Sequence, residues 1–432
     1  MHDAGPLSPI LEWVNPRFGP ISKFRGSRLN YPEPPWWLYQ SDLVRNIGKY
    51  YAAENAAALG CSLDGDEAIR RSLGESVERY TGYNSLKAAE LMQIAAGESE
   101  LLPLFPYCLL DEECSVNFKG ATVAYNRSTM LTHTPARRLK DGNHVWIPAG
   151  EMHLAFWPKA PEPIITLPIS AGLSFHSGPV KAIWSGICEL AERDQMMIFW
   201  WNKISIPKIT IDKNTAGRNL SQRIFQIEKA GIKIHLLSMN INFPIPAIFC
   251  VLESDRFPFY VAGASAHEDA EIACCGAIDE AMSIRFSQVK YARDSVVESF
   301  EEFNWVKAFI DHATLYANWP NSPALDFLLK NNPNKLSLDD YKAQHWLQAP
   351  GSMDDLSKIA TQLEALGLTV LWSDLTSTEA AELGTCVKVT IPEMVPLNVA
   401  HKVRWLACPR LNINKKESIR ASDFNPYPHP FP

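Results

Sequence analysis

The chain has 432 residues, of which 46% are hydrophobic and 21% charged, so it is too long for one ordinary core and too apolar for a disordered polypeptide. These proportions predict a globular protein of two or three intimately packed subdomains. The formal net charge of −7, without any basic stripe, argues against a general nucleic-acid or anionic-membrane surface, so we expect neither partner.

The expected location is the cytoplasm. The N-terminal stretch MHDAGPLSPILEWVNP lacks the basic and apolar regions of a secretory signal, and no proline-free apolar run is long enough to span a bilayer. The nine cysteines are an odd number and lack paired CxxC spacing, which indicates reduced thiols rather than a disulfide framework or a zinc site.

The predicted elements alternate between helices and strands along the chain. Such alternation predicts an α/β (α+β) protein with a mixed sheet. Helical spacing of apolar residues occurs at 65–82, 84–97, 181–201, 216–230, 267–287 and 354–366. Stretches rich in β-branched residues occur at 208–211, 233–237, 259–265, 369–375 and 386–391.

Two of the predicted helices carry paired carboxylates at the same spacing. SLGESVERY places Glu75 and Glu78 on one helix face, and SGICELAERD places Glu189 and Glu192 on another, with Arg193 beside them. Like charges at this spacing repel, so a cation is expected to offset them, and paired hard oxygen ligands suit Mg²⁺ with a nucleoside triphosphate. The alternative is two solvated helix faces, but the apolar run MMIFWW, which continues the second helix, indicates burial.

The C-terminal stretch NPYPHPFP has four prolines in eight positions. One interpretation is a frayed terminus, because proline joins neither helices nor central strands. The other is an ordered functional tail, since a polyproline-like segment loses little conformational entropy when it inserts into a cleft. We favour the second.

In order, spacing and ending, these motifs resemble the YcaO family, specifically its azoline-forming cyclodehydratases. Two further segments are similar to family motifs, namely 262–285 and 391–406. The resemblance implies a YcaO-like ATP-binding cyclodehydratase domain at 56–432, ending in the proline-rich tail 425–432, after an N-terminal extension at 1–55. It also implies that ATP phosphorylates a peptide amide oxygen, which then leaves as phosphate.

The resemblance assigns roles to individual residues. It implies that Mg²⁺ is held by Glu75, Glu78, Glu189 and Glu192, and that the nucleotide is faced by Ser72, Ser170, Arg193, Glu280 and Arg285. The carboxylate of Pro432 is implied to activate the attacking side chain, whereas Arg79 is expected to be structural. The chain departs from the family pattern in three places, with Gly60-Cys61-Ser62 in place of GKG, Ala171 in place of Asn, and Ser283 in place of Gln. Lys49 is a candidate for the missing lysine by proximity alone.

Three functions stay open on the sequence. The first is a cyclodehydratase that makes thiazoline or (methyl)oxazoline rings from Cys, Ser or Thr in a ribosomally made precursor peptide. The second is a thioamide- or amidine-forming YcaO enzyme, and the third is a non-catalytic ATP-binding scaffold. The first family motif begins near residue 60, so we expect a separate E1-like or ThiF-like protein to bind the peptide leader. A flavin-dependent azoline dehydrogenase is a further possible partner.

Overall fold

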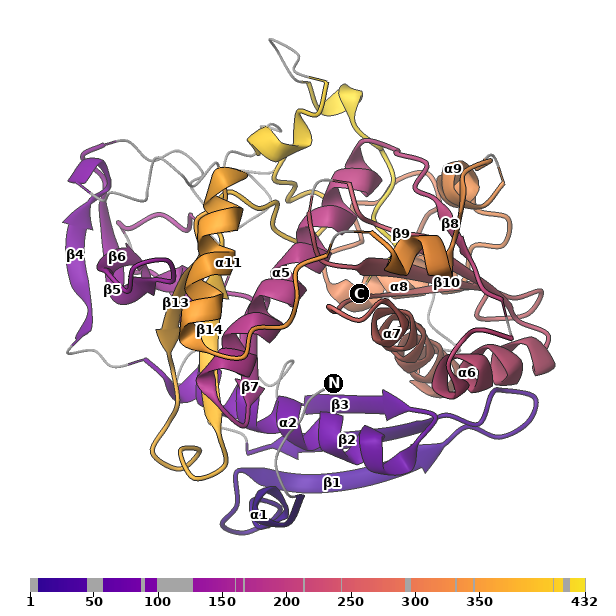
Figure 1. The fold of residues 1–432 in the computed structure, drawn as a ribbon, viewed down its shortest axis with the longest axis horizontal. Helices are drawn as coiled ribbons and strands as arrows, with labels where there is room; N and C mark the ends of the chain where they lie inside the picture. The colour runs from indigo at the N-terminus through magenta and orange to yellow at the C-terminus, as the bar shows by residue number, and fades with distance from the viewer. Residues whose placement is uncertain are drawn as a thin grey trace.

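The computed structural model describes residues 7–44, 57–86, 90–98, 127–159, 161–165, 168–212, 214–241, 243–291, 297–330, 332–344, 346–406, 408–414 and 420–431. Within these residues there are three β-sheets, and the long helix α5 (Pro179–Trp201) runs between two of them in Figure 1. Helices and strands alternate, and the sheets contain both parallel and antiparallel pairs. The predicted mixed α/β fold is therefore confirmed.

The first sheet comprises three antiparallel strands, β1 (Ile21–Arg28), β2 (Trp37–Leu43) and β3 (Ala57–Ser62). Helix α2 (Gly65–Asn84) packs on it, and begins where the Asp64 side chain accepts hydrogen bonds from the N–H groups of Asp66 and Glu67. A Cβ at Gly60 would lie 2.0 Å from the Ala68 carbonyl oxygen, so only glycine permits this approach of α2 to β3. This sheet joins strands from both sides of the boundary predicted at residue 55.

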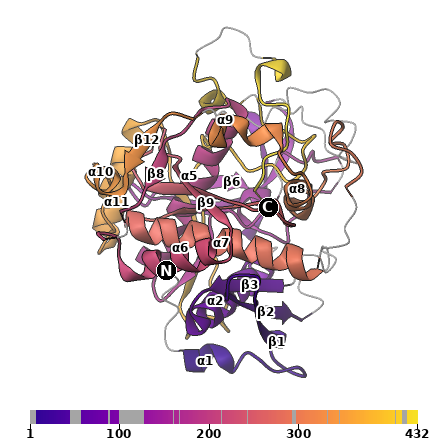
Figure 2. The same cartoon turned by 90° about the vertical axis from the view of Figure 1, so that its right-hand side faces the viewer.

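The second sheet has five strands in the order β11-β10-β9-β8-β12, with α6 (Arg218–Lys229) and α7 (Ala270–Tyr291) on one face. Figure 2 shows α7 between this sheet and the first one. A Cβ at Gly263 would lie 2.3 Å from the Ala281 nitrogen, so glycine again permits close helix–sheet packing. The five strands are β8 (Lys208–Thr210), β9 (Lys233–Ser238), β10 (Ala247–Glu253), β11 (Tyr260–Ala266) and β12 (Lys335–Ser337).

The third sheet lies on the other side of α5 and has the order β4-β5-β13-β14-β7, with β6 paired to β5. Helix α11 (Met353–Ala365) and α5 share a hydrophobic cluster with β14. The helix predicted at 84–97 is wrong, because Met92–Ala95 forms β4 and pairs with β5. The strands of this sheet are β4 (Met92–Ala95), β5 (Met130–Arg138), β6 (His144–Pro148), β7 (Leu173–His176), β13 (Leu371–Asp374) and β14 (Thr385–Thr390).

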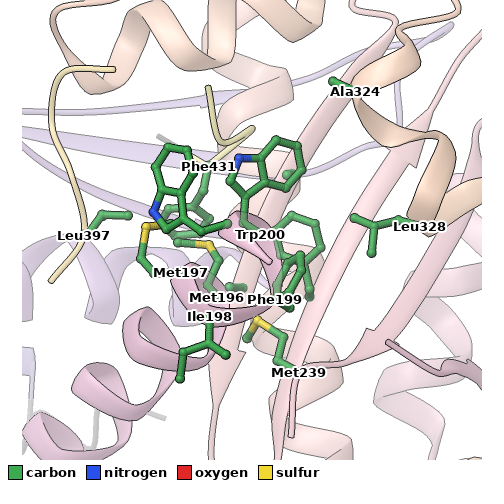
Figure 3. Packing of buried hydrophobic residues seen from close by; sticks show 14 of the residues in the cluster. Met196, Met197, Ile198, Phe199, Trp200, Met239, Ala324, Leu328, Leu397 and Phe431 are labelled. Atoms are coloured by element: carbon green, nitrogen blue, oxygen red, sulfur yellow. The ribbon is translucent and has the colours of Figure 1, made fainter. Parts of the chain in front are cut away.

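The largest cluster of buried side chains gathers around the C-terminal end of α5, where every residue from Met196 to Trp201 is buried. Figure 3 shows Trp200 and Met197 packed beside Phe431, a residue of the proline-rich tail. None of the described helices combines the length and the apolar character needed to cross a membrane. The remaining helices are α1 (Leu7–Leu11), α4 (Ala149–Met152), α8 (Phe309–Ala317), α9 (Asp326–Leu329) and α10 (Leu338–Lys342).

A buried carboxylate ties α7 to the elements on either side of it. Asp279 of α7 has a side-chain exposure of 0% and lies 2.9 Å from Nη1 of Arg71 on α2 and 2.8 Å from Nη2 of Arg223 on α6. Its other oxygen accepts a hydrogen bond from the Trp36 indole at 2.8 Å. Because buried ions are stable only when paired, this network fixes the position of α2 relative to α7.

We expect Asp279→Asn to lower the free energy of unfolding by about 3–5 kcal/mol, since it leaves Arg71 and Arg223 without their buried counterion. The exposed acid Asp354 provides a matched control, because Asp354→Asn should change stability by less than about 0.5 kcal/mol. Urea denaturation of both variants measures the difference. Equal midpoints for the two variants would contradict the assigned role of Asp279.

Candidate active site

The predicted pair on α2 contacts the backbone of two strands, β3 and β7. Glu75 accepts the Leu59 N–H at 2.5 Å through Oε2, and its Oε1 lies 2.6 Å from Nη2 of Arg79. Glu78 is hydrogen-bonded to the backbone of Phe175 in β7. Burial first, and then repulsion from Glu189 and Glu75, raises the pKa of Glu78 well above its usual range. The two carboxylates therefore lie in one electrostatic environment with a carboxylate of α5.

The predicted pair on α5 flanks a half-buried arginine. Glu189 accepts the Gly172 N–H at 3.0 Å. Nη1 of Arg193 lies 2.9 Å from Oε1 of Glu192, and Nη2 of Arg193 lies 3.5 Å from Oε1 of Glu189. Burial is the largest cause that raises the pKa of Glu192 to about 8. Attraction to Arg193 opposes this rise, and repulsion from Glu280 and Glu189 adds to it. The Arg193 Nε is buried and has no hydrogen-bond acceptor among the described residues. This donor is available to an anion.

A third helix contributes Glu280, which the sequence placed near the nucleotide. Its Oε2 accepts the Ala264 N–H of β11 at 2.6 Å. Burial is the largest cause that raises the pKa of Glu280 to about 7, with Arg193 opposing this and Glu189 and Glu75 adding to it. The structure thus brings together carboxylates from α2, α5 and α7, and these carboxylates repel one another.

This donor set fits a hard cation. Carboxylate oxygens are the ligands that Mg²⁺ prefers, and burial together with repulsion between the carboxylates raises the pKa values of Glu78, Glu192 and Glu280. Among the described residues, no three His, Cys, Asp or Glu side chains form a ready metal cage. Mg²⁺ typically binds through one or two carboxylates plus phosphate oxygens, so a closed protein cage is not required.

Two predicted nucleotide contacts are engaged elsewhere. Arg285 has a side-chain exposure of 0%, and Glu33 lies 2.5 Å from its Nε, while its Nη1 donates to the Pro258 carbonyl at 3.0 Å. It acts as a clamp between α7 and the β1–β2 connection. Ser72 is buried between α2 and the first sheet, where its hydroxyl lies 3.1 Å from that of Ser41. Its neighbours are protein groups because the close α2–β3 contact leaves no room beside it.

Of the remaining sequence candidates, Ser170 and Arg79 are described by the structure, whereas Lys49 and Pro432 are not. Ser170 lies in the loop before β7, where its carbonyl accepts the Leu173 N–H at 2.7 Å. Arg79 donates to the Ala57 carbonyl at 2.6 Å and pairs with Glu75, in agreement with a structural role. Lys49 and Pro432 lie outside the described residues.

The proline-rich tail is an ordered part of the core. The Trp200 indole donates to the Tyr427 carbonyl at 3.1 Å, and the Tyr316 hydroxyl donates to the Pro428 carbonyl at 2.6 Å. Phe431 has a relative exposure of 0%, and its ring lies 4.3 Å from the Arg193 guanidinium carbon. The tail therefore runs beside α5 to the arginine of the carboxylate cluster.

Sequence reasoning missed two charged residues near this cluster. Lys388 of β14 is 4% exposed, and its ammonium donates to the Ile169 carbonyl at 2.7 Å and to the Ala171 carbonyl. Asp194 of α5 is fully buried and pairs with Arg410 at 2.5 Å, which anchors the segment before the tail. The stretch CVKVTI contained the signal, because it places Lys388 within an otherwise apolar strand. A lysine in such a strand is rarely buried unless it has a partner.

A family model described as YcaO cyclodehydratase, ATP- and Mg²⁺-binding, matches residues 59–395. The chain therefore belongs to the YcaO family.

Solved structures share the fold at low sequence identity. A heterocyclase in complex with substrate and cofactor is 19% identical with a TM-score of 0.73, and the match covers 98% of this chain but only 57% of that chain. YcaO from Methanopyrus kandleri, bound with AMPPCP and Mg²⁺, is 17% identical with a TM-score of 0.59, and the match covers 87% of this chain and 86% of that one. A chain of the E. coli microcin synthetase McbBCD complex with pro-MccB17 bound is 14% identical with a TM-score of 0.61, and the match covers 96% of this chain and 99% of that one. At these identities the likeness shows the fold alone.

His312 of α8, which contacts the tail, makes the free energy of unfolding depend on pH. Its ring stacks on His429 with centroids 3.9 Å apart, and burial lowers the pKa of His312 to about 4. Between pH of about 6.5 and about 4 the unfolded chain binds a proton at this position that the folded chain does not. We expect the free energy of unfolding to be highest above this window and to fall as the pH falls through it.

In His312→Phe this fall should be smaller, as measured by urea midpoints between pH 7 and pH 4. His144→Phe, at an exposed position, is the control and should keep the slope of the parent protein. An unchanged slope in His312→Phe would show that burial does not lower the pKa of His312 below that of the unfolded chain.

Proposed function

We propose that the chain is an ATP- and Mg²⁺-dependent cyclodehydratase that forms thiazoline or (methyl)oxazoline rings from Cys, Ser or Thr of a ribosomally made peptide. The observation that carries the proposal is that carboxylates of α2, α5 and α7 lie close enough to act on one another, with Arg193 paired to Glu189 and Glu192. Such a set balances its charge by binding a divalent cation, and Mg²⁺ in turn carries a triphosphate. The family description agrees with this chemistry.

The residues of the site divide into those that would hold Mg²⁺ and those that would face the nucleotide. Glu75, Glu78, Glu189 and Glu192 would hold Mg²⁺, and Arg193, Glu280 and the loop that contains Ser170 would face the nucleotide. When bound, Mg²⁺ supplies charge neutralisation at the phosphates. The buried Nε of Arg193 would donate to a phosphate oxygen, which gives this donor the partner it lacks. We leave Ser72 and Arg285 out of this set because protein groups occupy their donors.

The reaction divides into three steps. The thiol or hydroxyl of Cys, Ser or Thr attacks the preceding amide carbonyl and loses its proton, so a C–S or C–O bond forms and the carbonyl oxygen becomes an alkoxide. That oxygen takes the terminal phosphoryl group of ATP and releases ADP. Phosphate then leaves as the nitrogen loses its proton and the C=N bond forms. Positioning and charge neutralisation are the protein's main contributions to such a transfer.

We propose that the enzyme works in the cytoplasm with partner proteins. A separate E1-like or ThiF-like protein would bind the leader of the precursor peptide, and a flavin-dependent dehydrogenase would oxidise the rings where azoles are the product. The structural neighbour in the microcin synthetase belongs to a multiprotein complex with a peptide bound, which supports a division of labour of this kind.

We expect Glu78→Gln and Glu192→Gln each to lower ATP-dependent dehydration by at least about a hundredfold, because each removes a charge that would offset Mg²⁺. The change keeps side-chain shape, so far-UV circular dichroism should match the parent. Loss of water from the peptide is measured by mass spectrometry, with the leader-binding partner present. Glu382→Gln, in an exposed turn, is the control. Parental rates in either cluster variant would rule out this assignment.

Pro432 follows Phe431 in the sequence, and the Phe431 ring lies over the Arg193 guanidinium. We propose that its carboxylate accepts the proton of the attacking side chain. Appending two residues after Pro432 keeps every side chain and moves only the carboxylate. It should lower cyclisation about a hundredfold, with ATP affinity changed by less than about threefold.

Deletion of Pro430 to Pro432 should have a similar effect on cyclisation. Isothermal titration with AMPPCP and kinetics of dehydration separate the two quantities. If the extended protein cyclises peptide at the parental rate, the tail serves packing alone.

A further inference from the structure

A small cavity with charged groups in its wall lies between α5, β14 and the segment 391–405. Its free volume is about 60 Å³. One water molecule needs about 10–15 Å³ on this measure, so the cavity has room for about four to six atoms of the size of oxygen. It is therefore too small for a nucleotide or a pair of residues, whereas a single tetrahedral oxyanion fits. The charged side chains that line it are Glu151, Arg193 and Lys388.

Lys388 supplies a positive charge that lacks a counterion. The residue is 4% exposed, and its ammonium donates to the carbonyls of Ile169, at 2.7 Å, and Ala171. An ammonium group has three N–H donors, so one donor is left. Among the residues that the structure describes, this ammonium has neither a third acceptor nor an ion-pair partner. A buried cation without a counterion is unfavourable, so an anion in the cavity would be stabilising.

Arg193 supplies a further donor to the same cavity. Its two Nη atoms are paired with Glu192 and Glu189, but its Nε is buried and has no acceptor in the described part of the chain. Hydrogen bonds from arginine and lysine to phosphate oxygens are strong because both partners are charged. The apolar side chains of Leu190 and Met394, which also line the cavity, keep water away and so strengthen such bonds.

Glu151 of α4 decides which oxyanion the cavity accepts. Its Oε2 lies 3.4 Å from the hydroxyl of Thr390, whereas its Oε1 is buried and has no hydrogen-bond partner among the described residues. An ionised carboxylate only accepts hydrogen bonds, so it repels a fully ionised anion such as sulfate. Monohydrogen phosphate keeps one P–OH group that can donate to Oε1, while its other oxygens accept from Lys388 and Arg193. The three side chains therefore complement HPO₄²⁻ better than SO₄²⁻.

We infer that this cavity binds monohydrogen phosphate, the ion that is released when the ring closes. The inference rests on the proposed function, in which the amide oxygen leaves as phosphate, and it adds the site that receives this product. The ion carries three oxygens from the terminal phosphoryl group of ATP and one from the amide, and with the proton that the nitrogen loses it is HPO₄²⁻. Arg193 pairs with two glutamates of the cluster and also lines the cavity, so it can hold the phosphoryl group during transfer and the phosphate afterwards.

Calorimetric titration tests the site directly. Sodium phosphate, and in a parallel run sodium sulfate, is titrated at constant ionic strength into the full chain saturated with ADP and Mg²⁺. ADP fills the nucleotide site of the product complex, so phosphate cannot bind there. We expect phosphate to bind at least about tenfold more tightly than sulfate, because sulfate leaves the buried oxygen of Glu151 without a donor. Equal affinities, or loss of phosphate binding when ADP and Mg²⁺ are present, would overturn the inference.

Two substitutions in the cavity should act in opposite directions. Lys388→Met removes the buried charge and should weaken phosphate binding at least about tenfold, whereas Lys307→Met, at an exposed position, should not change it. Glu151→Gln adds an N–H donor beside its acceptor oxygen and should bring the affinity for sulfate to within about threefold of that for phosphate. A gain of sulfate binding cannot arise from unfolding. If sulfate binding stays weak in Glu151→Gln, this carboxylate does not select the ion and the assignment is wrong.

Kinetics distinguish failure of this inference from failure of the proposed function. With the leader-binding partner present, phosphate should inhibit ATP-dependent dehydration of the peptide by the parent protein, and sulfate at the same concentration should inhibit it less. If peptide is dehydrated but the two anions inhibit equally, the phosphate site alone is wrong. If phosphate binds selectively, with the expected effects of Lys388→Met and Glu151→Gln, but no peptide is dehydrated, the cavity binds phosphate and the proposed function is wrong.

Discussion

Burial of carboxylates from α2, α5 and α7 close to one another is the unfavourable arrangement that the surrounding structure must stabilise. Glu78, Glu192 and Glu280 all have raised pKa values because they are buried near one another. Arg193 and Arg79 balance part of this charge, and backbone N–H groups balance more. The negative charge that is left unbalanced can stay buried because contacts away from the cluster fix each of the three helices and keep them from moving apart.

Those contacts differ for each helix. Helix α2 is held against β3 at Gly60 and is tied to α7 by the Arg71–Asp279 ion pair. Helix α7 is also held by Arg223 and by the clamp between Arg285 and Glu33. Helix α5 ends in a wholly apolar segment around which the largest cluster packs. The contacts that fix the three helices thus lie outside the cluster.

The C-terminal tail links the hydrophobic cluster around α5 to the carboxylate cluster. Its backbone carbonyls accept hydrogen bonds from Trp200 and Tyr316, and its Phe431 ring covers Arg193. Asp194, which follows Arg193 in the chain, pairs with Arg410 and so anchors the segment that leads to the tail. One turn of α5 therefore positions both the carboxylate cluster and the path of the C-terminal segment.

The sequence by itself determined the features that depend on local order. The spacing of Glu75, Glu78, Glu189 and Glu192 placed each pair on one helix face, and proline content indicated a stiff tail, because helix periodicity and proline geometry act over a few residues. Only the tertiary structure decided which groups meet across the chain. Residues 92–95 form a strand because β5 lies beside them, Arg285 is bound by Glu33 from 252 positions away, and Lys388 is buried beside the loop at 169–171. These outcomes depend on pairings between distant segments, whose free energy is invisible in a local pattern.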